Sequence, residues 1–332
     1  MTLRMAVSAL FLVNGLLVGS WAPKIPAFMS RLSISEGMAG LLVLLLGLGS
    51  LCVMPLLGGM VARHGSARAI RLAGWGLAPA LIFISLAPDP VSIGLAILFF
   101  GGMVGGMDVA MNANAVAAER AKGRAIMSSC HGFWSLGAFL GAGLGGMAIH
   151  ALGELAHAVL VSAIFTLVLA GVQGHLLQDG PAPGSTRVPL HLPRRPLPYL
   201  IGVMALLAMV PEGAVLDWAA VYLTRELGAS LAVAGWGFAA CAGAMAVMRF
   251  MGDALRRRLG AVRCLRFSAV LAMLGLSVAA LADRPSGAIA GFALAGLGIA
   301  KRVPCAFSAE GNVDGVPPGV GVAGGTLCGE SG

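Results

Sequence analysis

Residues 37–62 read GMAGLLVLLLGLGSLCVMPLLGGMVA, a run that contains no charged side chain. The apolar core of a bilayer is about 30 Å thick, and roughly 20 helical residues cross it. This run is therefore long enough to form a membrane-spanning helix. Charged side chains return in the basic segment RHGSARAIR at residues 63–71. The alternation of long apolar runs with short charged segments decides the fold class.

The same alternation continues along the whole chain. Of the 332 residues, 58% are hydrophobic and 11% are charged, and the mean hydropathy is +0.91. A soluble protein carries about 25% charged residues, so this composition excludes the soluble class and predicts a lipid bilayer as the surroundings. The runs are too long for the strands of an outer-membrane barrel and lack their period-two alternation.

We therefore predict an all-α, polytopic membrane protein with about ten transmembrane helices. The predicted spans are residues 5–26, 37–62, 70–88, 91–117, 125–149, 155–177, 198–223, 230–251, 265–282 and 286–308.

The net charge of +8 does not indicate nucleic-acid binding, because the 22 Lys and Arg residues occupy short segments between apolar runs. The six cysteines show no Cys-x-x-Cys spacing, so we predict neither a metal site nor a disulfide framework. No nucleotide-binding loop, nucleophile or acid/base dyad has a recognisable spacing. We expect no ATP or other cofactor and no enzymatic activity, and the sequence leaves the oligomeric state open.

Basic residues are concentrated in alternate loops. The basic loops contain Arg63, Arg68 and Arg71; Arg120, Lys122 and Arg124; Arg187, Arg194 and Arg195; and Arg256, Arg257, Arg258 and Arg263. The loops between them are poorer in basic residues and contain Lys24, Arg31, Asp89, Glu154, Arg225, Glu226, Asp283 and Arg284. Because cytoplasmic loops carry an excess of Lys and Arg, this bias predicts a cytoplasmic N-terminus.

A segment rich in proline and arginine separates the sixth and seventh predicted spans. It covers residues 178–198 and contains six prolines and three arginines, a composition typical of an extended linker. We predict a six-helix bundle at residues 1–177, a cytoplasmic linker at 178–198 and a second transmembrane bundle at 199–332.

An internal repeat relates the two predicted bundles. The pattern R-x-G-x-x-R-x-x-R begins at Arg63 and again at Arg258, an offset of 195 residues (258 − 63). Chance could produce a short arginine pattern, but both copies follow the second span of a bundle, which favours duplication. At this offset the second bundle lacks about two spans, so we expect a C-terminally truncated bundle.

The repeated loop resembles a motif of the major facilitator superfamily, written G-x-x-x-D-R-x-G-R-R/K, which joins helices two and three in that family. Gly58, Arg63, Gly65 and Arg68 carry the first copy; Asp253, Arg258, Gly260 and Arg263 carry the second. Ala62 replaces the motif's aspartate and Ser66 one of its arginines. The resemblance implies that these residues form gating loops, although without the usual salt bridge in the first copy.

A finer resemblance comes from two other segments. His131–Gly137 and Glu212–Trp218 are similar to bacterial inner-membrane permeases of the sugar–proton symporter branch that includes fucose permease. The resemblance implies a multi-pass protein of the bacterial inner membrane, and a symporter that moves a small polar solute with H⁺ by alternating access. An exporter of drugs or metabolites with the same fold, or a degenerate membrane protein without transport activity, remain alternatives.

Carboxylates inside the predicted spans are candidates for the proton pathway. A charged group at the bilayer centre costs about 2.5–3.5 kcal/mol on insertion scales, so such a group needs a reason to be there. Asp108 and Asn112 are four residues apart and share one helical face. Glu212 follows Pro211 near the middle of its span, and Asp217 lies closer to one end. A structural contact between helices, or an interfacial position for Asp217, is the alternative to a role in transport.

Three further polar or aromatic residues are candidates for solute binding. His131 and Trp134 lie on the fifth span, which faces the central cavity in the facilitator family, and Asn14 lies on the first span. His131 could bind a solute by a hydrogen bond and Trp134 by ring stacking. Ordinary packing is the alternative for His131, and for Asn14 it is slightly preferred.

Overall fold

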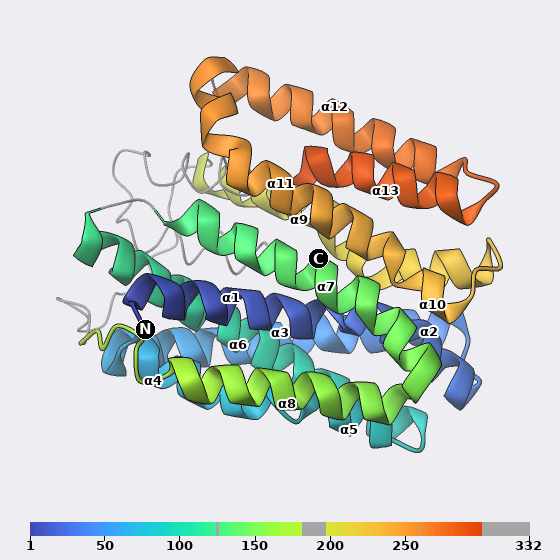
Figure 1. The fold of residues 1–332 in the computed structure, drawn as a ribbon, viewed down its shortest axis with the longest axis horizontal. Coiled ribbons are helices and arrows are strands. Elements are labelled where there is room, and N and C mark those ends of the chain that lie inside the picture. The colour runs from blue at the N-terminus through green and yellow to red at the C-terminus, as the bar shows by residue number, and fades with distance from the viewer. Residues whose placement is uncertain (124–125, 181–196, 260, 301–332) are drawn as a thin grey trace.

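The computed structural model describes residues 1–123, 126–180, 197–259 and 261–300, and every regular element among them is a helix (Figure 1). The helices are α1 Leu3–Gly19, α2 Trp21–Leu32, α3 Glu36–His64, α4 Ser66–Leu77, α5 Ala80–Leu86, α6 Pro90–Lys122, α7 Met127–Leu152, α8 Glu154–Val172, α9 Leu197–Arg225, α10 Leu231–Ala234, α11 Trp236–Leu259, α12 Ala261–Ala280 and α13 Pro285–Ile299.

Seven helical segments of the described residues are long and apolar enough to cross a membrane. They are Leu3–Leu32, Glu36–His64, Ser66–Leu86, Pro90–Lys122, Met127–Leu152, Glu154–Val172 and Leu231–Met251. Two shorter apolar helices follow at Arg266–Ala280 and Pro285–Ile299. The 29-residue α9 occupies the seventh predicted span. The prediction of an all-α polytopic membrane protein is therefore confirmed.

Several predicted spans differ from the observed helices at their ends and within their length. The span predicted at 70–88 consists of two helices, because Pro79 has no N–H with which to continue the hydrogen bonds of α4. The first span is divided at Ser20, and the eighth at Gly235. The eighth span also extends to Leu259, beyond its predicted end at residue 251, because hydrogen-bonded helix continues into the basic segment.

Glycines allow pairs of helices to approach through their backbones. A Cβ atom at Gly137 on α7 would lie 1.9 Å from the carbonyl oxygen of Leu12 on α1, and one at Gly101 on α6 would lie 2.0 Å from that of Leu46 on α3. No side chain fits at such positions. The glycines of α6 and α7 therefore permit close packing of these helices against α3 and α1.

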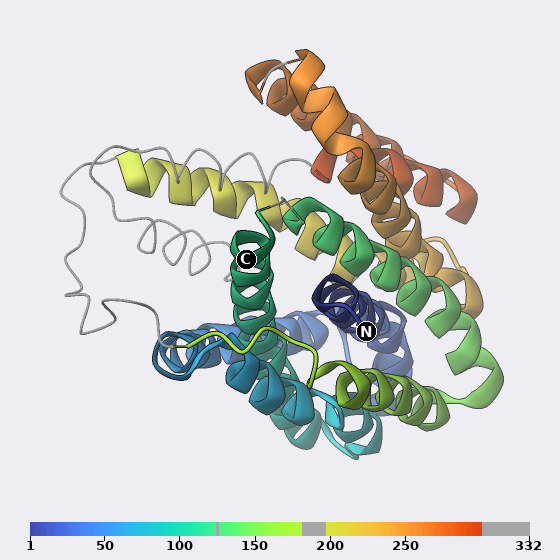
Figure 2. The same ribbon diagram turned by 60° about the vertical axis from the view of Figure 1, so that its left-hand side comes forward.

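The helices form two groups, which we call the first helix group (α1–α8) and the second helix group (α9–α13). In the first group α1 packs against α7 and α3 against α6; in the second, α13 packs against both α11 and α12. Figures 1 and 2 show α7 lying between α1 and α11. The two groups meet where α7 contacts α10 and α11 and where α2 contacts α9.

The backbones of the two groups come very close at one point, where α7 meets the break between α10 and α11. A Cβ atom at Gly235 would lie 2.0 Å from the carbonyl oxygen of Ala142. A Cβ atom at Gly146 would lie 2.7 Å from the carbonyl oxygen of Leu231. Glycine is therefore required on both sides of this contact.

The starts of the helices follow the offset found in the sequence. Helices α3, α4 and α6 begin at residues 36, 66 and 90, and α10, α12 and α13 begin at 231, 261 and 285. Each difference is 195 residues (231 − 36, 261 − 66 and 285 − 90). The repeated arginine pattern thus belongs to a longer repeat that includes helix boundaries.

One cluster of charged side chains lies inside the first helix group. Lys24 was expected in a loop, but it lies on α2 and is fully buried, with its Nζ 3.6 Å from Oε1 of Glu154. Nε of Arg31 lies 2.9 Å from Oε2 of the same carboxylate. Helix α2 continues to Leu32, so the two basic residues point from a helix toward the first turn of α8.

Candidate functional site

A buried arginine connects the two helix groups. Arg249 lies on α11 and its side chain is only 7% exposed. Its Nη1 donates a hydrogen bond to Oγ of Ser135 on α7. Its Nη2 lies 3.3 Å and 3.2 Å from the two carboxylate oxygens of Glu212 on α9. Arg249 thus contacts the first helix group through Ser135 and its own group through Glu212.

The ion pair between Arg249 and Glu212 balances two charges inside the apolar part of the molecule. A guanidinium stays protonated in proteins, so burial cannot neutralise Arg249. Removing one partner of a buried ion pair typically costs about 3–5 kcal/mol, because the other charge is left without compensation. Glu212 lies near the middle of α9, directly after Pro211. The predicted intramembrane carboxylate therefore has a basic partner.

An aromatic residue and an amide complete this part of the structure. Nε1 of Trp134 donates to Oδ1 of Asn14 across a distance of 2.9 Å, which joins α7 to α1. The guanidinium carbon of Arg249 lies 5.9 Å from the centre of the Trp134 ring, within the range of a cation–π interaction. We call Asn14, Trp134, Ser135, Glu212 and Arg249 the arginine cluster.

A second set of contacts joins the groups toward the predicted outer end. Nε1 of Trp21 donates to Oδ1 of Asp217 at 2.8 Å, which connects α2 to α9. Nε of Arg225 lies 3.7 Å from Oε1 of Glu36, although both of these side chains are largely exposed. We call these four residues the outer latch. Asp217 is thus a partner of the first helix group, in a different place from the arginine cluster.

Asp108 and Asn112 lie on one face of α6, as their spacing predicts, and both are partly buried. Nδ2 of Asn112 donates to the main-chain oxygen of Asp108 at 3.0 Å. The nearby Asn114 bonds to Oγ of Ser66 and to the oxygen of Leu177. Asn114 therefore connects α6 to α4 and to the segment after α8.

His131 packs edge-on against a phenylalanine. The centres of the His131 and Phe11 rings are 5.4 Å apart, with an angle of 73° between the ring planes. Phe11 is fully buried on α1. This arrangement corresponds to the packing alternative that the sequence left open for His131.

The first gating-loop motif has a partner outside the motif. Gly65 has φ 82°, a conformation that favours glycine, and a Cβ atom there would lie 2.0 Å from the main-chain oxygen of Asp179. The Asp179 carboxylate accepts hydrogen bonds of 2.8 Å from both N and Oγ of Ser66, at the start of α4. Asp179 therefore caps the helix that follows the loop.

The arginines of that motif are exposed. Arg63 and Arg68 face the surroundings, and no ion pair of either occurs within the described ranges. Gly58 lies on α3, and Arg263, on α12, is also exposed. The side chains of Asp253 and Arg258, together with Gly260, lie outside the described residues.

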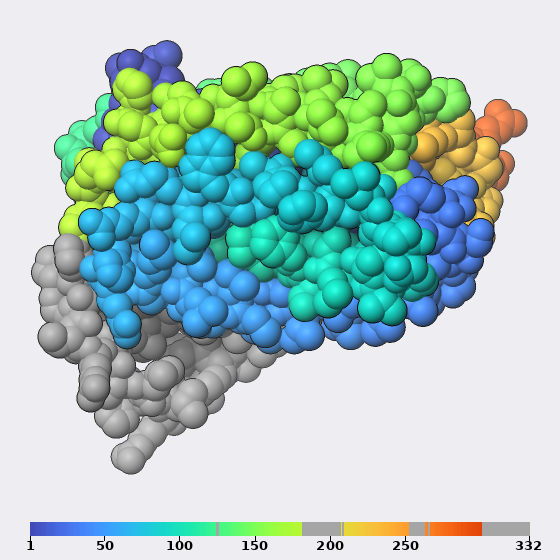
Figure 3. Space-filling model, turned by 90° about the horizontal axis from the view of Figure 1, so that it is seen from below, coloured from blue at the N-terminus to red at the C-terminus, as the bar shows by residue number. Residues whose placement is uncertain are grey.

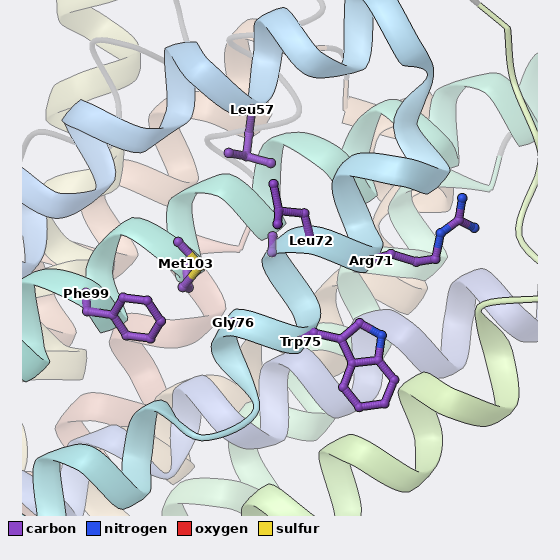
Figure 4. Close-up of a pocket in the computed structure, with 8 residues that line it drawn as sticks. Leu57, Arg71, Leu72, Trp75, Gly76, Phe99 and Met103 are labelled. Atoms are coloured by element: carbon purple, nitrogen blue, oxygen red, sulfur yellow. The ribbon is translucent and has the colours of Figure 1, made fainter.

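An apolar recess lies apart from the arginine cluster and shares no lining residue with it. It has a volume of about 630 Å³ and lies between α3, α4 and α6, lined by Leu57, Leu72, Trp75, Phe99, Met103 and others (Figure 4). Figure 4 shows the Arg71 guanidinium extending away from these apolar side chains. Figure 3 displays a face of the molecule that is formed largely by the first helix group. Leu72, Trp75 and Phe99 in the lining of the recess are exposed. Its lining suits lipid chains better than a polar solute.

Sequence reasoning overlooked three residues that the structure places at important contacts. The span predicted at residues 230–251 ends two residues after Arg249, whereas α11 continues to Leu259. An arginine inside an otherwise uncharged run is the signal that could have identified it. Ser135 and Asp179 carried no such signal, because their partners are distant in sequence.

The fold and this cluster define the class of protein: a multi-pass helical membrane protein in which a few polar groups lie between two helix groups. Residues 7–309 match the Major Facilitator Superfamily. The chain belongs to this superfamily and is a membrane transporter.

The relatives support the same assignment. An uncharacterized MFS-type transporter of Yersinia pestis is 35% identical over 323 residues, which cover 97% of this chain and 84% of that protein. An uncharacterized transporter of Sinorhizobium fredii is 35% identical over 322 residues, covering 96% of this chain and 84% of its own length. Membrane protein MosC of Rhizobium meliloti is 31% identical over 330 residues, which cover 98% of this chain and 80% of that protein.

Solved structures show the same fold. The nucleoside transporter NupG has a TM-score of 0.72 at 15% identity, covering 100% of this chain and 89% of that chain. A bacterial homolog of the human lysosomal transporter Spinster has a TM-score of 0.69 at 16% identity, covering 99% of this chain and 80% of that chain. At these identities the likeness concerns the fold alone.

Proposed function

We propose that the chain is a secondary active transporter that moves a small polar solute by alternating access, with proton coupling. The observation that carries this proposal is the position of Arg249. Its guanidinium is bonded to Ser135 in the first helix group and to Glu212 in the second. A relative motion of the groups would change the first contact while the second could remain.

The proton pathway in this proposal uses carboxylates inside the membrane. Glu212 lies beside a permanent positive charge, so its protonation changes the charge of the whole arginine cluster. Asp108 is a second candidate, on α6. The sugar–proton symporter branch and the cytoplasmic N-terminus are the finer parts of the proposal. The sequence resemblance and the distribution of basic loops support them.

The test uses the purified full chain in proteoliposomes that contain a pH-sensitive dye. Hexoses, polyols, nucleosides, amines and carboxylates are added in turn under an inward proton gradient, and internal acidification is measured. We expect at least one solute class to drive proton entry, with loss of this flux in Glu212→Gln and Asp108→Asn. The control is Glu226→Gln, because Glu226 is exposed in the turn after α9.

The same experiment separates uptake from export. Internal acidification on adding solute outside the vesicles identifies a symporter, whereas internal acidification of vesicles loaded with solute identifies exchange of solute for protons and an exporter. If no solute moves a proton, and the two carboxylate variants behave as the unmodified chain does, proton coupling is refuted.

A further inference from the structure

The arginine cluster has more hydrogen-bond donors than acceptors. Nδ2 of Asn14 is buried, with no partner in the part of the chain that the structure describes. The orientation of this amide is fixed, because Nε1 of Trp134 can only donate and therefore faces Oδ1. Nε of Arg249 likewise makes no hydrogen bond to a described residue. A ligand that satisfies these groups must supply acceptor oxygens.

The contact between Arg249 and Glu212 is longer than the best that a guanidinium makes with a carboxylate. Both carboxylate oxygens approach the same nitrogen, Nη2, at 3.3 Å and 3.2 Å. A two-pronged pair uses two nitrogens, and charge-assisted hydrogen bonds are typically about 2.7–2.9 Å long. A free carboxylate could bind the guanidinium through two nitrogens, an arrangement that Glu212 does not reach in this structure.

Charge limits the kind of anion. The cluster contains one guanidinium and one carboxylate, so it is neutral when Glu212 is ionised. A bound monocarboxylate restores neutrality only if Glu212 has taken up a proton. A phosphate monoester carries close to two negative charges at neutral pH and would leave one uncompensated in apolar surroundings. A single carboxylate is therefore the anion that fits.

We infer that the transported solute carries one carboxylate group, that Arg249 binds it, and that a proton on Glu212 releases Arg249 for this binding. This inference rests on the proposed function, since it assumes that Glu212 carries the coupled proton. Solute and proton then cross together as one negative and one positive charge. The cycle moves no net charge, so the membrane potential does not drive it.

Few other titratable groups surround Glu212. Cys241 lies on α11 together with Arg249, His131 lies on α7, and Asp217 lies further along α9, bonded to Trp21. Lys24 on α2 is paired with Glu154. Helices α10 and α13 carry no titratable side chain in their described lengths. The proton that controls Arg249 is thus assigned to Glu212.

Binding to the unmodified chain tests this inference without any variant. Lactate, glycerate and gluconate are titrated into the purified protein, each beside its primary amide, at several pH values between 5.5 and 7.5. We expect at least one carboxylate to bind at least about tenfold more tightly than its amide. Its affinity should fall about tenfold for each unit of rising pH while Glu212 is ionised, because one proton is linked to binding.

Two variants and a control locate the effect. Glu212→Gln keeps the side-chain volume and is neutral at every pH, so the affinity of this variant for a carboxylate solute should not change with pH. It should still exchange labelled solute across vesicles, but it should not accumulate solute under a proton gradient. Arg249→Gln should lose the preference for the acid over the amide. Glu226→Gln, a change at an exposed carboxylate, should retain the wild-type pH dependence.

The outcomes separate this inference from the proposed function. Proton flux driven by a neutral polyol or nucleoside, with no carboxylate bound, overturns the inference and leaves proton-coupled transport intact. Carboxylate binding that is independent of pH in the unmodified chain also overturns it. If no solute of any class moves a proton, both proposals are refuted.

Discussion

At Glu154, one carboxylate faces two basic side chains from α2. Lys24 is fully buried and Glu154 is 12% exposed. Replacing Glu154 by Ala leaves the Lys24 charge without a partner, so we expect the free energy of unfolding to fall by about 3–5 kcal/mol. Thermal unfolding in detergent, followed by tryptophan fluorescence, measures the effect.

An exposed ion pair provides the control for this prediction. The side chains of Glu36 and Arg225 are 59% and 45% exposed, so Glu36→Ala should cost no more than about 1 kcal/mol. The double variant Lys24→Met/Glu154→Ala should recover much of the lost stability, since it removes the unpaired charge. A double variant no more stable than Glu154→Ala would contradict the explanation.

Asp89 caps α6 from outside the membrane and should give a dependence of stability on pH. Hydrogen bonds from the backbone N–H and the hydroxyl of Ser92, and from the N–H of Val91, hold the pKa of Asp89 below its ordinary value of 3.8. Because the pKa is lower in the folded state than in the unfolded state, ionised Asp89 stabilises the fold, and it does so fully at pH values above its ordinary pKa. This contribution is lost as the pH falls through the lowered one.

We therefore expect Asp89→Ala to lower the melting temperature at pH 7, and by less near pH 3. Asp89→Ser keeps a capping oxygen without a titratable group, so it should remove the pH dependence and retain most of the cap. Melting curves of the three proteins at both pH values test this. A difference between Asp89→Ala and the unmodified chain that is equal at both pH values would disprove it.

At the residue scale, the sequence identified charges more readily than their partners. Glu212 and Asn14 could be selected because polar groups are rare in apolar runs. Their partners Arg249 and Trp134 are 37 and 120 residues distant, a separation on which local periodicity gives no information. The prediction that Lys24 lies in a loop was wrong for a related reason. In the sequence, a buried charge with a distant partner cannot be distinguished from a charge that marks the end of a span.

At the scale of elements, the contact between α1 and α7 depends on glycine. A Cβ atom at Gly137 would lie 1.9 Å from the carbonyl oxygen of Leu12, which is backbone and cannot move aside alone. We expect Gly137→Ala to separate the helices and to reduce stability by about 3 kcal/mol, at the upper end of overpacking effects. It should also weaken solute binding, because Trp134 and Ser135 precede Gly137 on the same helix.

Gly171 on α8 provides a matched control for that substitution, because no atom lies within 4 Å of a Cβ placed there. Gly171→Ala should leave stability unchanged or raise it by up to about 1 kcal/mol, since alanine favours helix. Melting temperature and expression of both variants are to be compared. Equal behaviour of Gly137→Ala and Gly171→Ala would show that close backbone packing is not required.

The existence of the long helices could be predicted from composition, because about 20 uncharged residues have few alternatives in lipid. The ends of these helices and the breaks within them could not be predicted from composition. The break at Pro79 falls inside an uncharged run, where hydropathy is uniform, and the extension of α11 to Leu259 runs through a basic segment. Charge marks the limit of the apolar layer, whereas hydrogen bonding decides where a helix ends.

At the scale of the whole molecule, the outer latch should control access from one side. Asp217→Leu removes the acceptor of the Trp21 indole at similar volume. The probe is a cysteine introduced by Gly40→Cys, which lies beside Trp218. We expect this cysteine to react about tenfold faster with a maleimide when Asp217→Leu is also present. The reason is that one lost buried hydrogen bond amounts to about 1.4 kcal/mol, which corresponds to a factor of ten. Mass spectrometry of the labelled peptide measures the rate.

The control for the latch is Glu36→Gln, which breaks only the exposed pair with Arg225. Its effect on the labelling rate should remain below about twofold. Equal labelling rates with Asp217 and with Leu at that position would contradict a role of the Trp21–Asp217 bond in closing this end.

The repeat was predicted from a short arginine pattern, with Leu32 and Gly40 matching Leu227 and Gly235 at the same offset. Helix starts at the same 195-residue offset extend it to three pairs of elements. How the two groups meet could not be predicted, because the contacts between α7 and α11 and between α2 and α9 depend on packing. The division at residues 178–198 remains a prediction from composition.

The close contact at Gly146 and Gly235 has a mechanical consequence. Main-chain atoms of the two groups meet directly at this point, with the side chains of Phe139 and Trp236 packed beside it, so one backbone can tilt on the other here. We expect this point to act as a pivot, about which the opposite ends of the molecule swing furthest. A bulky residue at either glycine would then stop the rocking while leaving each set of helices folded.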